Sequence, residues 1–320
     1  MQSIVAIGGS AGALSVLRTI LGGLPAGFPL PLCVVLHIGR HRSSYDELLD
    51  QAGPLRVVFA REGDELQAGT VYLAPPDRHL LIRADRLHLS QGPRENFARP
   101  AIDPLFRSAA QACGTGAIGV LLSGRLNDGS AGLYELKQHG GIAIVQDPAT
   151  ADQPDMPSNA LANVAVDFRV APGEIAPRLV ALAARVPAVP SSVPEPHEES
   201  TMASGEFARP VAITCPECGG AMRRHDAGTL VGYECHIGHR LTGEAVAMQQ
   251  DGILEHHMEA ALRLANERAE LCRVMAAQAR ARGEDSAAHW EALAREALER
   301  RFVLSKWQGR GPEDNADVAA

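Results

Sequence analysis

The sequence predicts an α/β fold: a doubly wound, mostly parallel sheet with helices on both faces, plus a small zinc-binding module and a C-terminal helical pair. Short apolar strands alternate with helical stretches over residues 1–184, which favours parallel strands joined by helical crossovers. Three cysteines and a histidine cluster within 212–245. Residues 252–308 are rich in Ala, Leu, Glu and Arg with helical periodicity, which predicts the helical pair.

Apolar and β-branched runs mark the expected strands of the first domain. They are Ile4–Ile7, Leu32–Leu36, Val57–Phe59, Thr70–Leu73, His79–Arg83, Leu87–Ser90, Ala117–Leu122, Ile142–Val145 and Val164–Val170. The expected helices between them are Ala13–Leu21, Tyr45–Gln51, Ile102–Ala112, Ala131–His139, Ser158–Ala162 and Pro172–Ala184. The Val71–Leu89 region lacks a helical pattern, so we expect a hairpin there, forming an antiparallel edge of the sheet.

The remainder of the chain divides by composition. Prolines among Ser, Glu and Ala predict an extended linker at 185–211, before the cysteine module at 212–245. A helical hairpin is expected at 250–308, broken at Gly283, with helices at 252–282 and 284–307. The Gly/Asp/Ala-rich tail at 309–320 is expected to be disordered.

Composition excludes several classes of protein. The 320 residues suit two domains, and 46% hydrophobic residues indicate a globular chain. A net charge of −8 gives no basic footprint for nucleic acid. No segment reads as a signal peptide or a membrane span, so we expect a cytoplasmic protein without membrane insertion. Cys33, Cys113 and Cys272 are interpreted as small buried hydrophobes.

The segment Gly8–Gly12 fits the pattern G-x-S-x-G between a strand and a helix. A serine on such a turn is exposed at the sheet edge, and the following helix N-terminus offers free N–H groups to an oxyanion. The Ala11 N–H, which follows Ser10, is the expected first donor. A phosphate-binding turn is the alternative, although Ser10 replaces the second glycine of the dinucleotide fingerprint.

A nucleophilic serine needs a base and an orienting group. His37 directly follows the strand 32–36, and Asp128 lies in a glycine-rich turn after the strand 117–122, so both belong to strand exits. Each has a structural alternative. A histidine after a strand is often structural, and Asp128 could cap the next helix. Other histidines compete with His37 but lack its position after a strand: His41, His79, His88 and His139.

Several separated motifs resemble the catalytic domain of the chemotaxis protein-glutamate methylesterase (CheB) family. They are Ile4–Gly12, Val34–His37, Pro75–His79, Asp103–Ala110, Leu122–Leu133, Gln146–Pro148 and Met156–Pro157. The resemblance covers residues 1–184, and it implies a methylesterase-like catalytic domain there. The family typically hydrolyses γ-glutamyl methyl esters on chemoreceptor signalling helices, releases methanol and also deamidates certain receptor glutamines. A methylated chemoreceptor-like protein is therefore the expected partner, and no catalytic cofactor is expected.

The resemblance implies that Ser10 is the nucleophile, His37 its base and Asp128 the carboxylate that orients His37. It also implies that the backbone N–H of Arg125 joins the Ala11 N–H in binding the oxyanion. Two other functions stay open: a catalytically weak scaffold, or an esterase for a different protein or small-molecule ester.

The sequence departs from the family pattern beside these residues. Ser10–Ala13 reads Ser-Ala-Gly-Ala where Ser-Thr-Gly-Gly is usual, and Arg125-Leu126 replaces Met-Gly. Leu36 and Ile38 stand where Gln and Met are usual. Arg125 could hold a substrate carboxylate or remain solvated. The predicted first strand begins at residue 4, so we expect no phosphoacceptor receiver domain before it.

Cys215 and Cys218 form a C-x-x-C knuckle, and Cys235 and His239 follow at a spacing that suits tetrahedral zinc. His236 is the competing fourth ligand, but it adjoins Cys235 and would strain the chelate. A redox pair is the alternative to a metal site, although no thioredoxin-like unit follows it. Four protein ligands leave no open position, so we expect a structural zinc. The module and the helices after it could dock a partner, or form an autoinhibitory or dimerising arm.

Overall fold

The computed structural model describes residues 3–37, 45–185 and 211–308. It divides into two units, Met1–Val246 and Ala247–Ala320, and each is described by itself. Nearly all of the expected linker at 185–211, the expected disordered tail at 309–320 and His41 lie outside the described residues.

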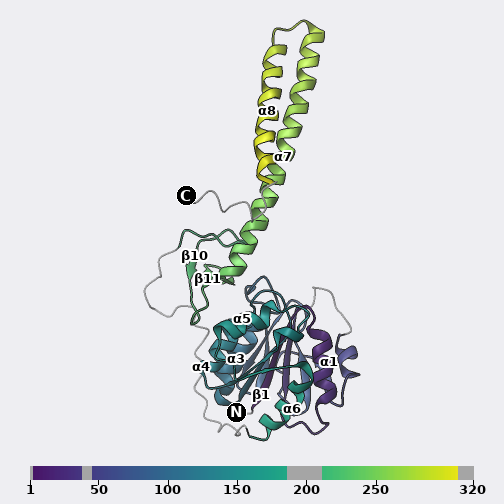
Figure 1. Ribbon diagram of the computed structural model, residues 1–320, viewed down its shortest axis with the longest axis vertical. Coiled ribbons are helices and arrows are strands. Elements are labelled where there is room, and N and C mark those ends of the chain that lie inside the picture. The colour runs from purple at the N-terminus through teal and green to yellow at the C-terminus, as the bar shows by residue number, and fades with distance from the viewer. Residues whose placement is uncertain (1–2, 38–44, 186–210, 309–320) are drawn as a thin grey trace. The chain divides into compact units, whose positions relative to one another are not determined.

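The first unit contains a sheet of seven strands, all parallel (Figure 1). In spatial order these are β3 (Arg56–Phe59), β4 (Thr70–Leu73), β2 (Leu32–Leu36), β1 (Ile4–Gly9), β7 (Ala117–Leu121), β8 (Ile142–Gln146) and β9 (Phe168–Val170). Every residue of β1, β2 and β7 is buried, as expected of parallel strands covered on both faces. The predicted doubly wound fold is confirmed.

Helices cover both faces of this sheet, because alternate strand residues point to opposite sides. Ile4 and Ala6 of β1 belong to one buried cluster with α3 (Ile102–Cys113), α4 (Ser130–Gln138) and α5 (Asp155–Asn163). Val5 and Ile7 belong to the other, with α1 (Ala13–Gly23), α2 (Tyr45–Asp50) and α6 (Pro172–Ala183). The sheet therefore has a separate hydrophobic core on each face.

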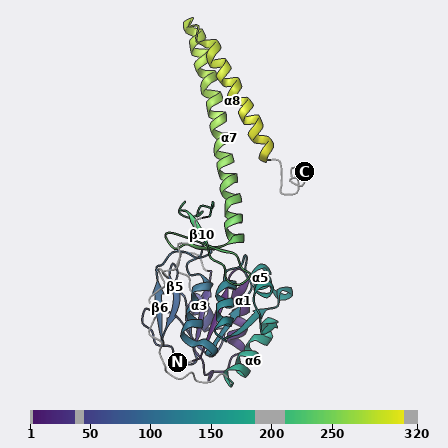
Figure 2. The same ribbon diagram turned by 90° about the vertical axis from the view of Figure 1, so that its left-hand side faces the viewer.

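The prediction that the hairpin forms an antiparallel edge of the main sheet is wrong. β5 (His79–Arg83) and β6 (Arg86–Ser90) form a hairpin of their own, outside the main sheet (Figure 2). Leu80 and Ile82 are buried in the α3-side core, and the Ile82 N–H donates to the Ser108 Oγ of α3 at 3.0 Å. The hairpin thus packs its apolar side chains onto a helix rather than extending the sheet.

The last strand is also shorter than expected. The strand predicted from Val164 begins at Phe168, because Val164 ends α5 by donating to the Ala160 carbonyl at 2.8 Å. The Val166 N–H then donates to the Val164 carbonyl at 2.8 Å, so this β-branched stretch forms a turn rather than a strand.

The cysteine module follows in the same unit as a three-stranded antiparallel sheet of β10 (Met222–Arg224), β11 (Gly232–Cys235) and β12 (Arg240–Thr242). Its small core contains Cys215, Met222, Cys235, Leu241 and Val246. A core of this size buries little apolar surface, so such a module generally needs a metal or disulfides to fold.

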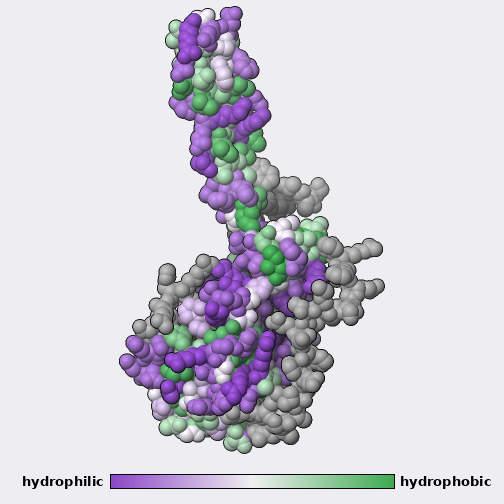
Figure 3. All heavy atoms as spheres, turned by 180° about the vertical axis from the view of Figure 1, so that it is seen from behind, coloured by the Kyte–Doolittle hydropathy of each residue, from purple (hydrophilic) through white to green (hydrophobic). Residues whose placement is uncertain are grey.

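Two long helices make up the C-terminal part. α7 (Gly243–Arg282) begins earlier than the predicted residue 252, and α8 (Ala287–Gln308) runs back antiparallel to it (Figure 1). Gly283 follows α7 with φ 68°, the left-handed conformation that commonly ends a helix. Hydrophobic and hydrophilic residues are interspersed along this pair (Figure 3). None of the described helices is both long and apolar enough to cross a membrane.

Candidate active site

The structure brings Ser10, His37 and Asp128 to one edge of the sheet. Ser10 follows β1, His37 follows β2, and Asp128 lies in the loop after β7. Because β1 pairs in parallel with both β2 and β7, the carboxyl ends of the three strands are adjacent. Chain connections lead from this point toward both edges of the sheet, which is where ligands bind in open α/β folds.

The turn after β1 presents Ser10 at this edge. The Ser10 N–H donates to the Ser123 carbonyl at 2.9 Å, and the Ala13 N–H donates to the Ser10 carbonyl at 3.1 Å. Gly12 has φ 81°, and a Cβ there would lie 2.6 Å from the Asp152 Cβ, so the turn requires glycine. The half-buried Ser10 hydroxyl makes no hydrogen bond to any residue that the structure describes. The turn therefore has the strand-to-helix form that the sequence predicts, while the Ser10 hydroxyl and His37 are not hydrogen-bonded to each other in the structure.

The loop opposite Ser10 is equally constrained. A Cβ on Gly124 would lie 2.9 Å from the Ser10 Cβ and 2.7 Å from the Met156 Cε. The Gly124 N–H donates to the Gln153 carbonyl at 3.1 Å, and the Met156 N–H donates to the Gly124 carbonyl at 2.9 Å. These contacts fix the backbone that faces the serine.

His37 and Asp128 are joined by a hydrogen bond of 2.8 Å between Nε2 and Oδ2. Asp128 is almost fully buried and also accepts the Ile102 N–H at 2.7 Å and the Gly129 N–H at 3.0 Å. Burial by itself would raise the pKa of Asp128, but hydrogen bonds from His37, Ile102 and Asn96 outweigh it and hold that pKa below its usual value. Because Nε2 contacts the carboxylate, Nδ1 is the nitrogen of His37 that makes no hydrogen bond to any other described residue.

Two buried residues beside Asp128 were missed by sequence reasoning. The Asn96 Nδ2 donates to Asp128 Oδ1 at 3.2 Å and to Asp103 Oδ2 at 3.1 Å. Burial and the charge of Asp128 raise the pKa of Asp103 well above its usual value, so Asp103 binds a proton more readily than Asp128 does. Asp103 belongs to a recognised motif, whereas nothing in the sequence marks Asn96 as a partner of Asp128.

The expected oxyanion donors are exposed beside Ser10. Within the described part of the chain, the backbone N–H groups of Ala11 and Arg125 are bonded to no acceptor. The Arg125 side chain donates from Nε to Gln153 Oε1 at 3.1 Å, so it is held at the rim of the site. Leu126, which stands where the family pattern has glycine, has φ 64°. A left-handed leucine is strained by about 1–2 kcal/mol.

The competing histidines have other roles. His79 is buried between the Pro93 carbonyl, 2.9 Å from Nε2, and the Ala101 N–H, 3.3 Å from Nδ1. His88 contacts Glu62, and His139 contacts the carbonyl of Glu135 in its own helix. None of these three follows a strand of the main sheet, whereas His37 directly follows β2.

The four expected metal ligands converge in the cysteine module: Cys215, Cys218, Cys235 and His239, whose ligand atoms all lie within 4.8 Å of one another. The Cys218 and Cys235 Sγ atoms are 3.7 Å apart, and the His239 Nδ1 lies 3.7 Å from the Cys215 Sγ and 3.5 Å from the Cys235 Sγ. Ligands on a tetrahedral zinc are separated by about 3.6–3.8 Å, so the group fits this ion. The competing His236 instead lies against Gly220.

The remaining cysteines are buried, as expected: Cys33, Cys113 and Cys272. Burial raises the pKa of the Cys113 thiol to about 12 and that of Cys33 further, which makes both unreactive.

Comparison with known proteins identifies the first domain. Residues 5–179 match the family model described as CheB methylesterase. A Leptospira interrogans protein is 39% identical over 180 residues, covering 56% of this chain and 93% of its own length. Protein-glutamate methylesterase/protein-glutamine glutaminase 3 of Anaeromyxobacter dehalogenans is 41% identical over 179 residues, which are 55% of this chain and 52% of that protein.

A solved structure shows the same architecture. The crystal structure of the Thermotoga maritima CheB methylesterase catalytic domain superposes with a TM-score of 0.55 and 32% sequence identity. The superposition covers 57% of this chain and 99% of the Thermotoga chain.

Proposed function

Because the chain belongs to the CheB methylesterase family, we propose that it is a serine hydrolase that removes methyl esters from glutamate side chains of chemoreceptors and releases methanol. The relatives' names include protein-glutamine glutaminase, so the proposal extends to deamidation of receptor glutamines. The observation that carries it is the 2.8 Å bond from His37 to the buried Asp128, at the strand ends next to Ser10.

The proposed reaction follows from these positions. His37 takes the hydroxyl proton while the Ser10 Oγ attacks the ester carbonyl, and Asp128 stabilises the resulting imidazolium. The Ala11 and Arg125 N–H groups donate to the oxyanion that forms. When the tetrahedral intermediate collapses, the bond to the methoxy group breaks and His37 delivers its proton to methanol. Water, activated by His37, then attacks the acyl-enzyme and releases the glutamate and Ser10.

Methanol release from methylated chemoreceptor cytoplasmic fragments tests this function. We expect release by the wild-type protein and its loss in Ser10→Ala, whereas Ser305→Ala, which changes an exposed serine of α8, keeps full activity. A serine-reactive phosphonate gives a second readout that does not depend on the substrate. Labelling without methanol release would indicate an esterase for another ester, and neither labelling nor release would indicate a scaffold.

We further propose that Cys215, Cys218, Cys235 and His239 bind a structural zinc. The fit of the ligand separations to tetrahedral zinc and the small size of the module's core support this. All four ligand positions would come from the protein, so the ion would stabilise the module and leave catalysis to Ser10. A cytoplasmic location and a role in chemotaxis signalling belong to the same proposal, since the substrate is expected in the cytoplasmic part of a receptor.

A further inference from the structure

The cysteine module is hydrogen-bonded to the loop that carries Asn96. β12 begins directly after the ligand His239, and Arg240 forms a parallel bridge with Glu95. The Asn96 N–H donates to the Arg240 carbonyl at 2.9 Å. The loop is thereby paired, backbone to backbone, with a strand that starts one residue after a metal ligand.

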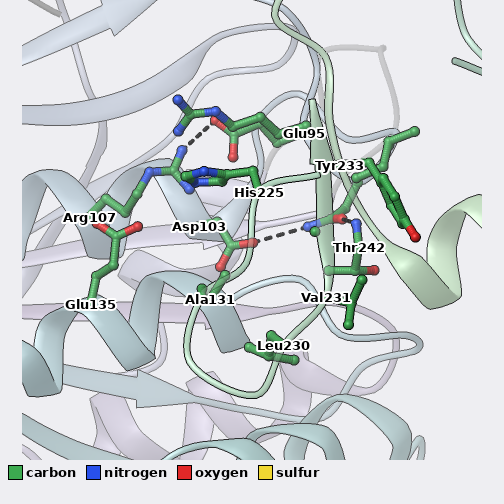
Figure 4. Close-up of a pocket in the computed structure, with 15 residues that line it drawn as sticks. Glu95, Asp103, Arg107, Ala131, Glu135, His225, Leu230, Val231, Tyr233 and Thr242 are labelled. Atoms are coloured by element: carbon green, nitrogen blue, oxygen red, sulfur yellow. Dashed lines mark hydrogen bonds and ion pairs between the residues drawn. The ribbon is translucent and has the colours of Figure 1, made fainter. Parts of the chain in front are cut away.

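Thr242, at the end of β12, connects the module to both sides of Asp128. Its N–H donates to Asn96 Oδ1 at 3.1 Å, and its Oγ1 donates to Asn127 Oδ1 at 2.7 Å. The same Asn96 amide donates from Nδ2 to Asp128, and Asn127 is the residue before Asp128. Asp103 Oδ2 accepts from the same Nδ2 at 3.1 Å, and Figure 4 shows Asp103 and Thr242 facing each other. All of these side chains are buried, so water does not compete for their bonds.

The loop conformation itself depends on the module. Asn96 has φ 48° and Phe97 has φ 62°, two consecutive residues in the left-handed conformation, which is disfavoured for a bulky residue such as phenylalanine. The Phe97 side chain packs on the module's core of Cys215, Met222, Cys235, Leu241 and Val246. Contacts with the module therefore offset the strain that places the Asn96 amide against Asp128.

Other parts of this interface are less closely packed. A pocket lies between the module and helices α3 and α4, lined by Arg107, Glu135, His225 and Tyr233 among others (Figure 4). Thr229 contributes a separate contact, in which its Oγ1 donates to Asn163 Oδ1 at 2.9 Å. Thr242 is thus the residue of the module that contacts the neighbours of Asp128. Thr229 belongs to the same interface but contacts none of those neighbours.

We propose that Thr242 and Asn96 are positioning residues through which the metal-bound module holds Asp128 in its working orientation, so that ester hydrolysis depends on a metal that takes no part in the chemistry. This inference rests on the proposed serine hydrolase function. It predicts that loss of the metal and loss of the Asn96 amide slow the reaction by the same route.

Two variants of the full-length protein isolate this route. Asn96→Gly removes the amide while keeping a residue that accepts positive φ, and we expect kcat to fall about 10- to 100-fold with KM unchanged, since a bond to a charged group is lost. Thr242→Val removes the hydroxyl that donates to Asn127 and accepts the Ala245 N–H, and we expect a fall of about three- to tenfold. Thr229→Val, the matched control, keeps the wild-type kcat.

The pH profile of kcat/KM distinguishes positioning from a general loss of structure. Without the Asn96 donor, Asp128 loses one of the bonds that hold it against His37, so we expect the pH profile of kcat/KM to change in Asn96→Gly. Stripping the metal from wild type with a chelator should reproduce the lower kcat and the shifted profile, and stripping it from Asn96→Gly should add little, because both act through one bond.

Wild type that keeps its kcat and pH profile after metal removal would overturn the inference, as would an Asn96→Gly protein that is folded and fully active. Failure of the proposed function is separate, because wild type would then neither release methanol nor react with a phosphonate. If only the phosphonate reacts, its labelling rate replaces kcat in every comparison.

Discussion

His37 Nε2 and Asp128 Oδ2 lie 2.8 Å apart although 91 positions separate the two residues in the chain. They meet because β2 and β7 flank β1, and each pairs with it in parallel. Asp128, the buried residue of this pair, is also the most heavily hydrogen-bonded carboxylate of the site. It accepts from Ile102, Gly129 and Asn96 as well. The orientation of His37 is therefore fixed before a substrate arrives.

Replacing this carboxylate should abolish most activity. In Asp128→Asn the neutral amide cannot stabilise the imidazolium, and we expect kcat to fall about 10⁴-fold. Methanol release and phosphonate labelling measure it. Asp147→Asn, in which a partly exposed carboxylate paired with Arg169 is lost, should stay near wild type. If the kcat of Asp128→Asn stays within tenfold of the wild-type value, Asp128 is not the carboxylate that orients His37.

Stability should fall in mild acid because of His79. Burial lowers the pKa of His79 below its ordinary value of 6.5, against the opposing effects of the Pro93 carbonyl, Glu95 and Asp128. The unfolded chain therefore binds more protons, so the free energy of unfolding decreases as the pH falls below 6.5, until it passes the folded pKa. Urea unfolding at about pH 7.5 and 5.5 measures the slope. His79→Gln should show a shallower slope, and an unchanged slope would argue against this source.

Leu126 should be a site of stored backbone strain. Its φ of 64° favours glycine, so Leu126→Gly relieves about 1–2 kcal/mol and loses about 0.5–1 kcal/mol to the entropy of the unfolded chain. Compared with Leu126→Ala, which lacks the side chain but keeps the strain, we expect Leu126→Gly to be more stable by about 0.5–1 kcal/mol. Urea unfolding decides this, and a less stable glycine variant would refute it.

Metal binding should depend on Cys235. Purified wild type is expected to carry one zinc per chain, and Cys235→Ser should lose it, because serine replaces a thiolate in a soft tetrahedral site. Elemental analysis gives the stoichiometry. Cys272→Ala, which changes a buried cysteine of α7, is the control and should retain the ion. Full zinc in Cys235→Ser would remove this residue from the ligand set.

The strands of the main sheet could be predicted from sequence because each is a short β-branched run between turn residues. Leu32–Leu36 and Thr70–Leu73 have the predicted bounds. The hairpin at 79–90 was expected at the sheet edge, since its pattern shows a buried face but does not say which surface buries it. Val164 and Val166 are as β-branched as any strand residue, but the end of α5 sets their conformation.

The placement of the candidate site residues was predictable where a residue type adjoins a strand. Ser10, His37 and Asp128 each follow a strand of the sheet, and parallel pairing then brings them together. Asn96 could not be found in this way, because its role depends on a left-handed turn and on Thr242, 146 positions later in the chain. Local patterns predict strands and ligand spacings, whereas contacts between parts that are distant in the chain arise only from packing.

Gly124 limits how this enzyme could be redesigned. Any side chain there would collide with Ser10 and Met156, so a mutant library that varies position 124 would mostly sample inactive protein. Variation in the esters accepted has to come from neighbours with room, above all the exposed Arg125 and its partner Gln153. A directed-evolution campaign on this enzyme should therefore hold the glycine constant and randomise those two positions together.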